Sequence, residues 1–114
     1  MSGRDLTPAE FRTQAERAKL KPIMGGLFLE DTSLGGQVSY AAVTVGGRLD
    51  YRASLDYALR KRAEHLRLGQ QVIKLRAQNK GIDQIARLLD QPADLLLTME
   101  ANAKRADELA RAAA

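Results

Sequence analysis

The fold is decided where the sequence changes character, in the stretch Val43-Thr44-Val45-Gly46-Gly47-Arg48-Leu49-Asp50-Tyr51-Arg52-Ala53-Ser54-Leu55. Before it, short apolar runs alternate with glycine pairs, as in a small sheet; after it, the composition is helical. Gly46-Gly47 can adopt the positive φ angles of a two-residue hairpin turn. We therefore predict an α+β fold: an N-terminal helix, a small antiparallel β-meander, a long basic helix and a C-terminal helical hairpin.

The β-like region covers residues 27–51, with runs at Leu27–Leu29, Gln37–Val45 and Arg48–Tyr51. A meander of two or three such strands is not stable alone and needs a helix packed over one face. The pair Gly35-Gly36 leaves an alternative open, in which this region is a long ordered loop with one hairpin.

An N-terminal helix precedes the strands. Thr7 is suited to the N-cap, Pro8 to the first helical position and Glu10 to the reciprocal bond of a capping box. We expect this helix to end near Leu20, ahead of Pro22. Its apolar stripe is thin and consists of Phe11, Ala15, Ala18 and Leu20.

A long helix follows over residues 53–79, with Gly69 as an internal weak point that could bend or split it. At 100° per residue its apolar side chains form two faces, so we expect packing on both sides. Leu55, Leu59, Leu66, Ile73 and Ala77 form one face, and Tyr57, Leu68, Val72 and Leu75 the other.

The positive charge is concentrated in this helix. Residues 52–80 hold eight basic and two acidic side chains, whereas residues 1–51 hold six of each and residues 81–114 hold four basic and six acidic ones. A basic stripe of this kind can follow a phosphate backbone, although charged stripes are also the ordinary exterior of helices. The candidate nucleic-acid contacts are Arg60, Arg67 and Lys74 at heptad spacing, and Arg62, Arg76 and Lys80 on the opposite side.

The segment from Gly81 to Met99 predicts a helix over residues 82–89, a turn at Asp90-Gln91-Pro92 and a last helix from Ala93 to about Leu109. It resembles the helix-turn-helix motif of bacterial repressors and sigma-factor-like domains. The resemblance implies buried pairs Ile85 with Leu89 and Leu96 with Met99, with Ala86 at the close approach. It departs from the motif at Asp90, where glycine is usual, and at Gln91, where an apolar residue is usual.

The chemistry of the last helix differs from that of a DNA reader. Its expected outward face is Ala93, Asp94, Leu97, Thr98 and Ala101, without a basic side chain before Lys104. A major-groove helix needs Arg, Lys, Asn or Gln on that face. An alternative interpretation is therefore that the hairpin is a structural element without DNA contact.

Three consecutive leucines on one helix span about 200° and cannot all enter one shallow groove. We predict a partner or dimer interface on this helix, and packing of the leucines within the chain is the alternative. The interface residues would be Leu95, Leu96, Leu97, Met99 and Leu109.

The remaining features bound the function. The 114 residues suit a single domain, made of residues 1–51 and a helical part from residue 52, and no run is apolar enough to span a bilayer. The chain has no Cys and its single His65 has no second ligand nearby, so we expect no catalytic residue, metal, cofactor or small-molecule substrate. We predict a cytoplasmic, non-enzymatic, DNA-associated accessory or regulatory factor that binds double-stranded DNA. The alternative is a protein-interaction module, such as an adaptor, inhibitor or assembly subunit, acting with a protein partner or as a homodimer.

Overall fold

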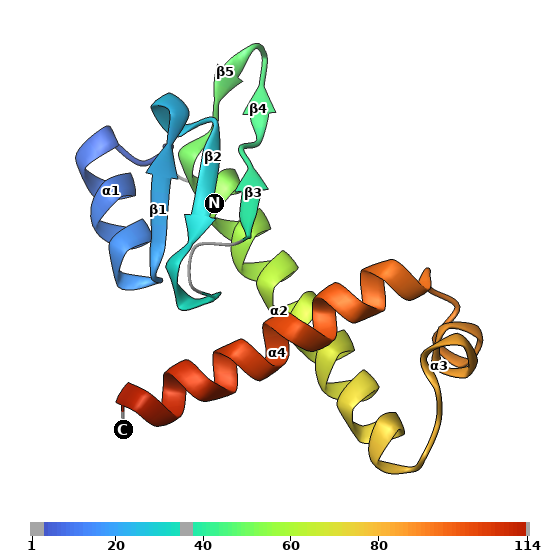
Figure 1. Ribbon diagram of the computed structural model, residues 1–114. Coiled ribbons are helices and arrows are strands. Elements are labelled where there is room, and N and C mark those ends of the chain that lie inside the picture. The colour runs from blue at the N-terminus through green and yellow to red at the C-terminus, as the bar shows by residue number, and fades with distance from the viewer. Residues whose placement is uncertain (1–3, 35–37, 114) are drawn as a thin grey trace. The chain divides into compact units, whose positions relative to one another are not determined.

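The computed structural model describes residues 4–34 and 38–113 and confirms the α+β class, with 67% helix and 14% strand (Figure 1). The chain divides into two compact units, the first extending to Lys61 and the second beginning at Arg62. In order, the elements are α1 (Pro8–Arg17), β1 (Leu20–Ile23), the 3-10 turn η1 (Met24–Gly26), β2 (Phe28–Asp31), η2 (Thr32–Leu34), β3 (Ser39–Ala41), β4 (Thr44–Val45), β5 (Arg48–Leu49), α2 (Tyr51–Ala77), α3 (Ile82–Leu89) and α4 (Ala93–Ala113).

Helix α1 begins as predicted, with a complete capping box. The Thr7 hydroxyl accepts a hydrogen bond from the Glu10 amide at 3.2 Å, and the Glu10 carboxylate accepts one from the Thr7 amide at 2.8 Å. The predicted end at Leu20 is wrong. Lys19 takes the left-handed φ of 58°, which ends the helix, and Leu20 enters a strand instead.

The main sheet has the order β1-β2-β3 and is antiparallel throughout. Strand β1 was not predicted, because Pro22 argued for a break. Pro22 is tolerated because β1 is an edge strand. The Lys19 carbonyl accepts from the Thr32 amide at 2.9 Å, and alternation along the strand then turns the Pro22 nitrogen away from β2.

The hairpin at Gly46-Gly47 is confirmed, with φ of 60° and 78° at the two glycines and β4 paired to β5. It forms a separate two-stranded sheet, so the continuous strand predicted over Gln37–Val45 is wrong; Gln37 lies outside the described residues. The strand is interrupted because Val43 bonds elsewhere. Its amide donates to the Ser54 hydroxyl at 2.9 Å, and its carbonyl accepts from the Asp50 amide at 2.9 Å.

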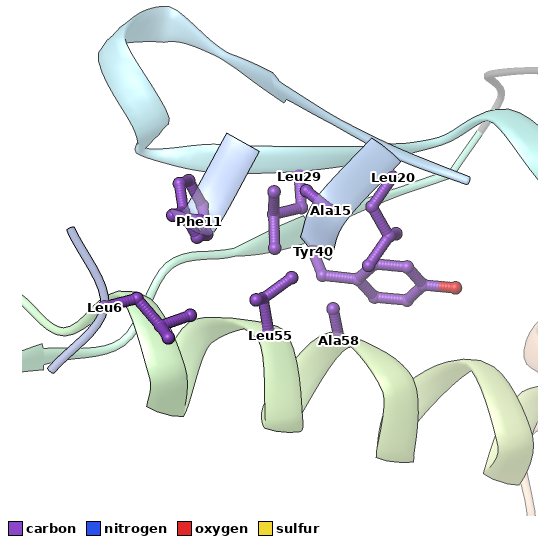
Figure 2. Packing of buried hydrophobic residues seen from close by; sticks show 8 residues of the cluster. All are labelled: Leu6, Phe11, Ala15, Leu20, Leu29, Tyr40, Leu55 and Ala58. Carbon is purple, nitrogen blue, oxygen red and sulfur yellow. The ribbon is translucent and has the colours of Figure 1, made fainter. Parts of the chain in front are cut away.

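The core of the first unit lies between the sheet and the first turns of α2, as predicted for a sheet that needs a covering helix (Figure 2). Leu29 and Tyr40 are cross-strand partners facing Leu55 and Ala58. The buried cluster is Leu6, Phe11, Ala15, Leu20, Leu29, Tyr40, Leu55 and Ala58.

One carboxylate is fully buried in this unit. Asp31 accepts hydrogen bonds from the Tyr40 hydroxyl at 2.7 Å, the Ser33 hydroxyl at 2.5 Å and the Ser33 amide at 3.0 Å. A buried charge is tolerated when its oxygens are satisfied in this way.

The first turn of α2 is capped by a residue from the other end of the unit. The Asp5 carboxylate accepts from the amides of Tyr51 at 3.0 Å, Arg52 at 2.9 Å and its neighbour Leu6 at 2.8 Å. These bonds, that from Arg52 first, hold the pKa of Asp5 below its ordinary value. The bond from the Thr7 amide likewise lowers the pKa of Glu10.

The second unit is built on the remainder of α2 together with α3 and α4. Val72, Ile85 and Leu96, one from each helix, are fully buried together. Gly69 does not interrupt α2, which runs unbroken to Ala77. It is instead the point of contact with α4: a Cβ built there would lie 2.2 Å from the Met99 carbonyl oxygen and 2.7 Å from the Ala103 Cβ.

Candidate nucleic-acid interface

Two of the predicted basic residues are exposed on the second unit. Arg67 and Lys74 are exposed, and neither forms an ion pair with any residue in the described part of the chain. They are separated by two turns of α2, about 10.5 Å along the helix axis. The exposed amide side chains of Gln70 and Gln78 belong to the same helix, and the half-buried Gln71 lies between them in sequence.

Arg76 is engaged inside the unit. Its guanidinium lies 2.6 Å from the Glu100 carboxylate of α4, and the Glu100 side chain is 8% exposed. The Lys104 ammonium lies 3.7 Å from the same oxygen. The Arg76 charge is therefore compensated by a buried carboxylate, and a phosphate would have to compete with that carboxylate for it.

The other three predicted basic residues have different settings. Arg60 is exposed and belongs to the first unit, whereas Arg67 and Lys74 belong to the second. Arg62 and Lys80 are half-buried. Of the six predicted basic residues, only Arg67 and Lys74 are exposed cations of the second unit that form no ion pair with a described residue.

A shallow hollow lies next to this pair, between α2 and α3. Its volume is about 310 Å³; Leu75 and Leu89 supply apolar surface, and Gln71, Lys74 and Gln78 supply polar groups. Lys74 thus stands beside apolar surface, where the methylene stem of a lysine can pack while its ammonium remains in water.

The helical hairpin that resembles a helix-turn-helix has the predicted elements. Asp90 takes the left-handed conformation at φ 52° in place of glycine, which asparagine and aspartate tolerate better than most residues. Pro92 lies one residue before α4, as predicted for the turn, and its carbonyl accepts a hydrogen bond from the Leu96 amide at 3.1 Å. Ile85, Leu96 and Met99 are buried and Leu89 is half-buried.

The outward side of α4 carries the chemistry expected from its sequence. Asp94, Leu97, Thr98 and Ala101 are exposed, and Ala93 is half-buried. The Thr98 hydroxyl donates to the Asp94 carbonyl at 3.1 Å, so it is occupied within the helix. This face offers an anion and an apolar side chain, and neither matches the donors that read base edges.

The predicted interface residues separate into two groups. Leu96 and Met99 are buried in the second unit, at 0% and 3% exposure, and Leu95 is half-buried. Leu97 and Leu109 are both 42% exposed, so these two can meet a partner without rearrangement. Leu88 of α3 was not singled out from the sequence and is 56% exposed; its position outside the inward-facing repeat of Ile82, Ile85 and Leu89 was the available signal.

Two further properties of the described residues concern metal ligands and membrane-spanning helices. No three His, Asp or Glu side chains among them come together in an arrangement that could hold a metal ion. None of the helices in the described ranges is long and apolar enough to cross a membrane.

Comparison with known proteins gives no relative for this chain. No protein-family model, curated protein or solved structure matches it.

Proposed function

We propose that this protein is a small, non-enzymatic, DNA-associated accessory factor in which Arg67 and Lys74 contact DNA phosphates. The observation that carries the proposal is the exposure of these two cations, on one helix and without an acidic partner among the described residues. About 10 Å of duplex presents roughly six phosphates, so two cations at this spacing can be matched without deforming the DNA. The neighbouring glutamine amides can donate further hydrogen bonds to phosphate oxygens.

The proposed binding is independent of base sequence. Contacts to phosphates position a protein on DNA but carry no sequence information. The part of α4 that would enter a major groove presents Asp94 and Leu97, which supply no donor for base edges. We therefore expect similar affinities for unrelated duplexes of equal length.

The test is a titration of a labelled random duplex over a series of salt concentrations. The Arg67→Ala, Lys74→Ala double variant should weaken binding and reduce the slope of log K against log salt by about 1.8, or about 0.9 for each phosphate that is no longer neutralised. The matched control is Arg105→Ala with Arg111→Ala, which removes the same charge from α4 and should leave most of that slope intact. Circular dichroism of each variant checks that helix content is unchanged.

Two outcomes would overturn the proposal. One is a wild-type chain that binds no duplex at low salt. The other is an equal reduction of the slope in the two double variants, which would show that only net charge matters and that α2 holds no site.

A second candidate function is supported by a different observation. Leu88 and Leu97, both on the α3–α4 hairpin, are exposed apolar side chains, and exposed apolar surface of this kind marks protein interaction sites when it is contiguous. If the hairpin mediates a homodimer, Leu97→Asp should abolish concentration-dependent sedimentation, whereas Thr98→Asp, at an adjacent exposed position that is turned by about 100° and is not apolar, should not. A wild-type chain that sediments as a monomer at all concentrations excludes the homodimer.

A further inference from the structure

A groove in the first unit has a chemistry that the proposed DNA contact does not use. It lies between the last turns of α1 and strand β1, has a volume of about 360 Å³, and is distinct from the surface of Arg67 and Lys74. Arg12 and Glu16 line it from the helix and Lys19, Lys21 and Pro22 from the following segment, and Leu20 forms part of its wall.

The groove carries uncompensated positive charge. Arg12, Lys19 and Lys21 are exposed, and none of the three forms an ion pair with a described residue. Glu16 is the one carboxylate among the lining residues. Three cations around one carboxylate favour an occupant with negative charge.

The backbone holds Lys19 firmly in place. Its left-handed φ of 58° would be adopted at less cost by glycine, which is the usual residue at this position after a helix. Its amide donates to the Glu16 carbonyl at 3.0 Å, and its carbonyl accepts from the Thr32 amide at 2.9 Å and the Thr32 hydroxyl at 2.8 Å. A cation is thus presented from a fixed backbone at a position where its side chain gives the fold no conformational advantage.

The wall of the groove indicates what else the occupant contains. Leu20 is 2% exposed and packs into the core, so the half-buried Pro22 supplies the apolar surface that an occupant can reach. Pro22 also lacks the outward N–H that an added strand would need, so the edge of β1 is poorly suited to backbone pairing with a further strand. Recognition would therefore rest on side chains, one part anionic and one part apolar.

We propose that this groove binds an acidic peptide segment, in which aspartate or glutamate side chains meet Arg12, Lys19 and Lys21 and an apolar side chain packs against Pro22. Charge complementarity selects the acidic residues, and the apolar wall selects a peptide over a bare anion. The Glu16 carboxylate supplies an acceptor for a peptide N–H, which inorganic phosphate does not have.

The test uses a fluorescein-labelled peptide Glu-Leu-Glu-Asp-Leu-Glu and its neutral counterpart Gln-Leu-Gln-Asn-Leu-Gln, measured by fluorescence anisotropy with the full chain. The acidic peptide should bind and the neutral one should not. Lys19→Gly should weaken binding about two- to fivefold while raising the thermal midpoint by a few degrees, because glycine fits the left-handed position. This opposite response separates an effect on the ligand from an effect on the fold.

Two further variants locate the site. Lys19→Gly combined with Lys21→Gln should weaken binding by about tenfold. Arg17→Gln combined with Arg48→Gln removes the same charge from exposed positions of the first unit outside the groove and should weaken it far less. Equal binding of the two peptides, equal weakening by the two double variants, or displacement of the peptide by inorganic phosphate at matching concentrations would each overturn the proposal.

Discussion

Gly69→Ala tests the packing on which the second unit depends. An added Cβ would lie 2.2 Å from the Met99 carbonyl oxygen and 2.7 Å from the Ala103 Cβ. An ordinary contact requires about 3.4 Å, so α2 and α4 must separate by about 1 Å. Overpacking of this kind costs about 1–3 kcal/mol, and a backbone oxygen that cannot rotate away favours the upper end.

Helix propensity opposes this cost. Alanine is better than glycine in a helix interior by about 1 kcal/mol. We therefore expect Gly69→Ala to lower the free energy of unfolding by about 2 kcal/mol, which corresponds to a fall in Tm on the order of 10 °C. Urea and thermal unfolding followed by far-ultraviolet circular dichroism measure both quantities.

The control is Gln70→Ala, which introduces the same residue at the adjacent exposed position and should change stability by less than about 0.5 kcal/mol. Adding Ala103→Gly to Gly69→Ala removes the 2.7 Å contact and should recover part of the stability, appearing as coupling in a double-mutant cycle. If Gly69→Ala instead stabilises the protein by the full propensity difference, α4 does not cross α2 at this glycine and the reasoning fails.

Three other predictions concern charged groups. Asp5→Ala should destabilise the first unit by about 1 kcal/mol, because it removes the acceptor for the first amides of α2; an unchanged urea midpoint would refute this. The fold lowers the pKa values of Asp5 and Glu10, so the two carboxylates stabilise it fully above their ordinary pKa values of 3.8 and 4.5. This stabilisation is lost as pH falls through the lowered pKa values. Unfolding midpoints should therefore drop in acid, and they should drop less steeply in Glu10→Gln. Arg76→Met should cost on the order of 1–3 kcal/mol by leaving Glu100 with only Lys104, and a neutral result would show that the pair is not formed in solution.

Local chemistry made several elements predictable from the sequence. The capping box at Thr7 and Glu10 and the hairpin at Gly46-Gly47 each depend on residues within a few positions of one another. The conformational preferences of these segments can therefore be predicted without knowledge of the rest of the fold. The face of α4 without basic side chains was predictable for the same reason, because helical periodicity alone places its residues.

Contacts between distant residues were not predictable. Strand β1 can contain Pro22 only because the Pro22 nitrogen faces the side without a neighbouring strand. Gly69 is a contact point only because α4 crosses α2 there. The pairing of Arg76 with Glu100 joins two helices and removes one cation from the predicted set. A charge stripe read from one helix cannot show which of its members another helix compensates.

The Asp5 cap makes the start of α2 depend on a residue that is distant in sequence. The Ala53 amide has a local acceptor in the Asp50 carboxylate at 2.9 Å, but Tyr51 and Arg52 receive theirs from 46 and 47 residues away, so these two amides are capped only after that loop has closed. In an isolated helix these two amides would exchange with solvent at nearly the rate of an unstructured peptide. Their protection against hydrogen exchange therefore reports, at two backbone positions, the moment at which the N-terminal segment docks during folding and the frequency with which it detaches afterwards.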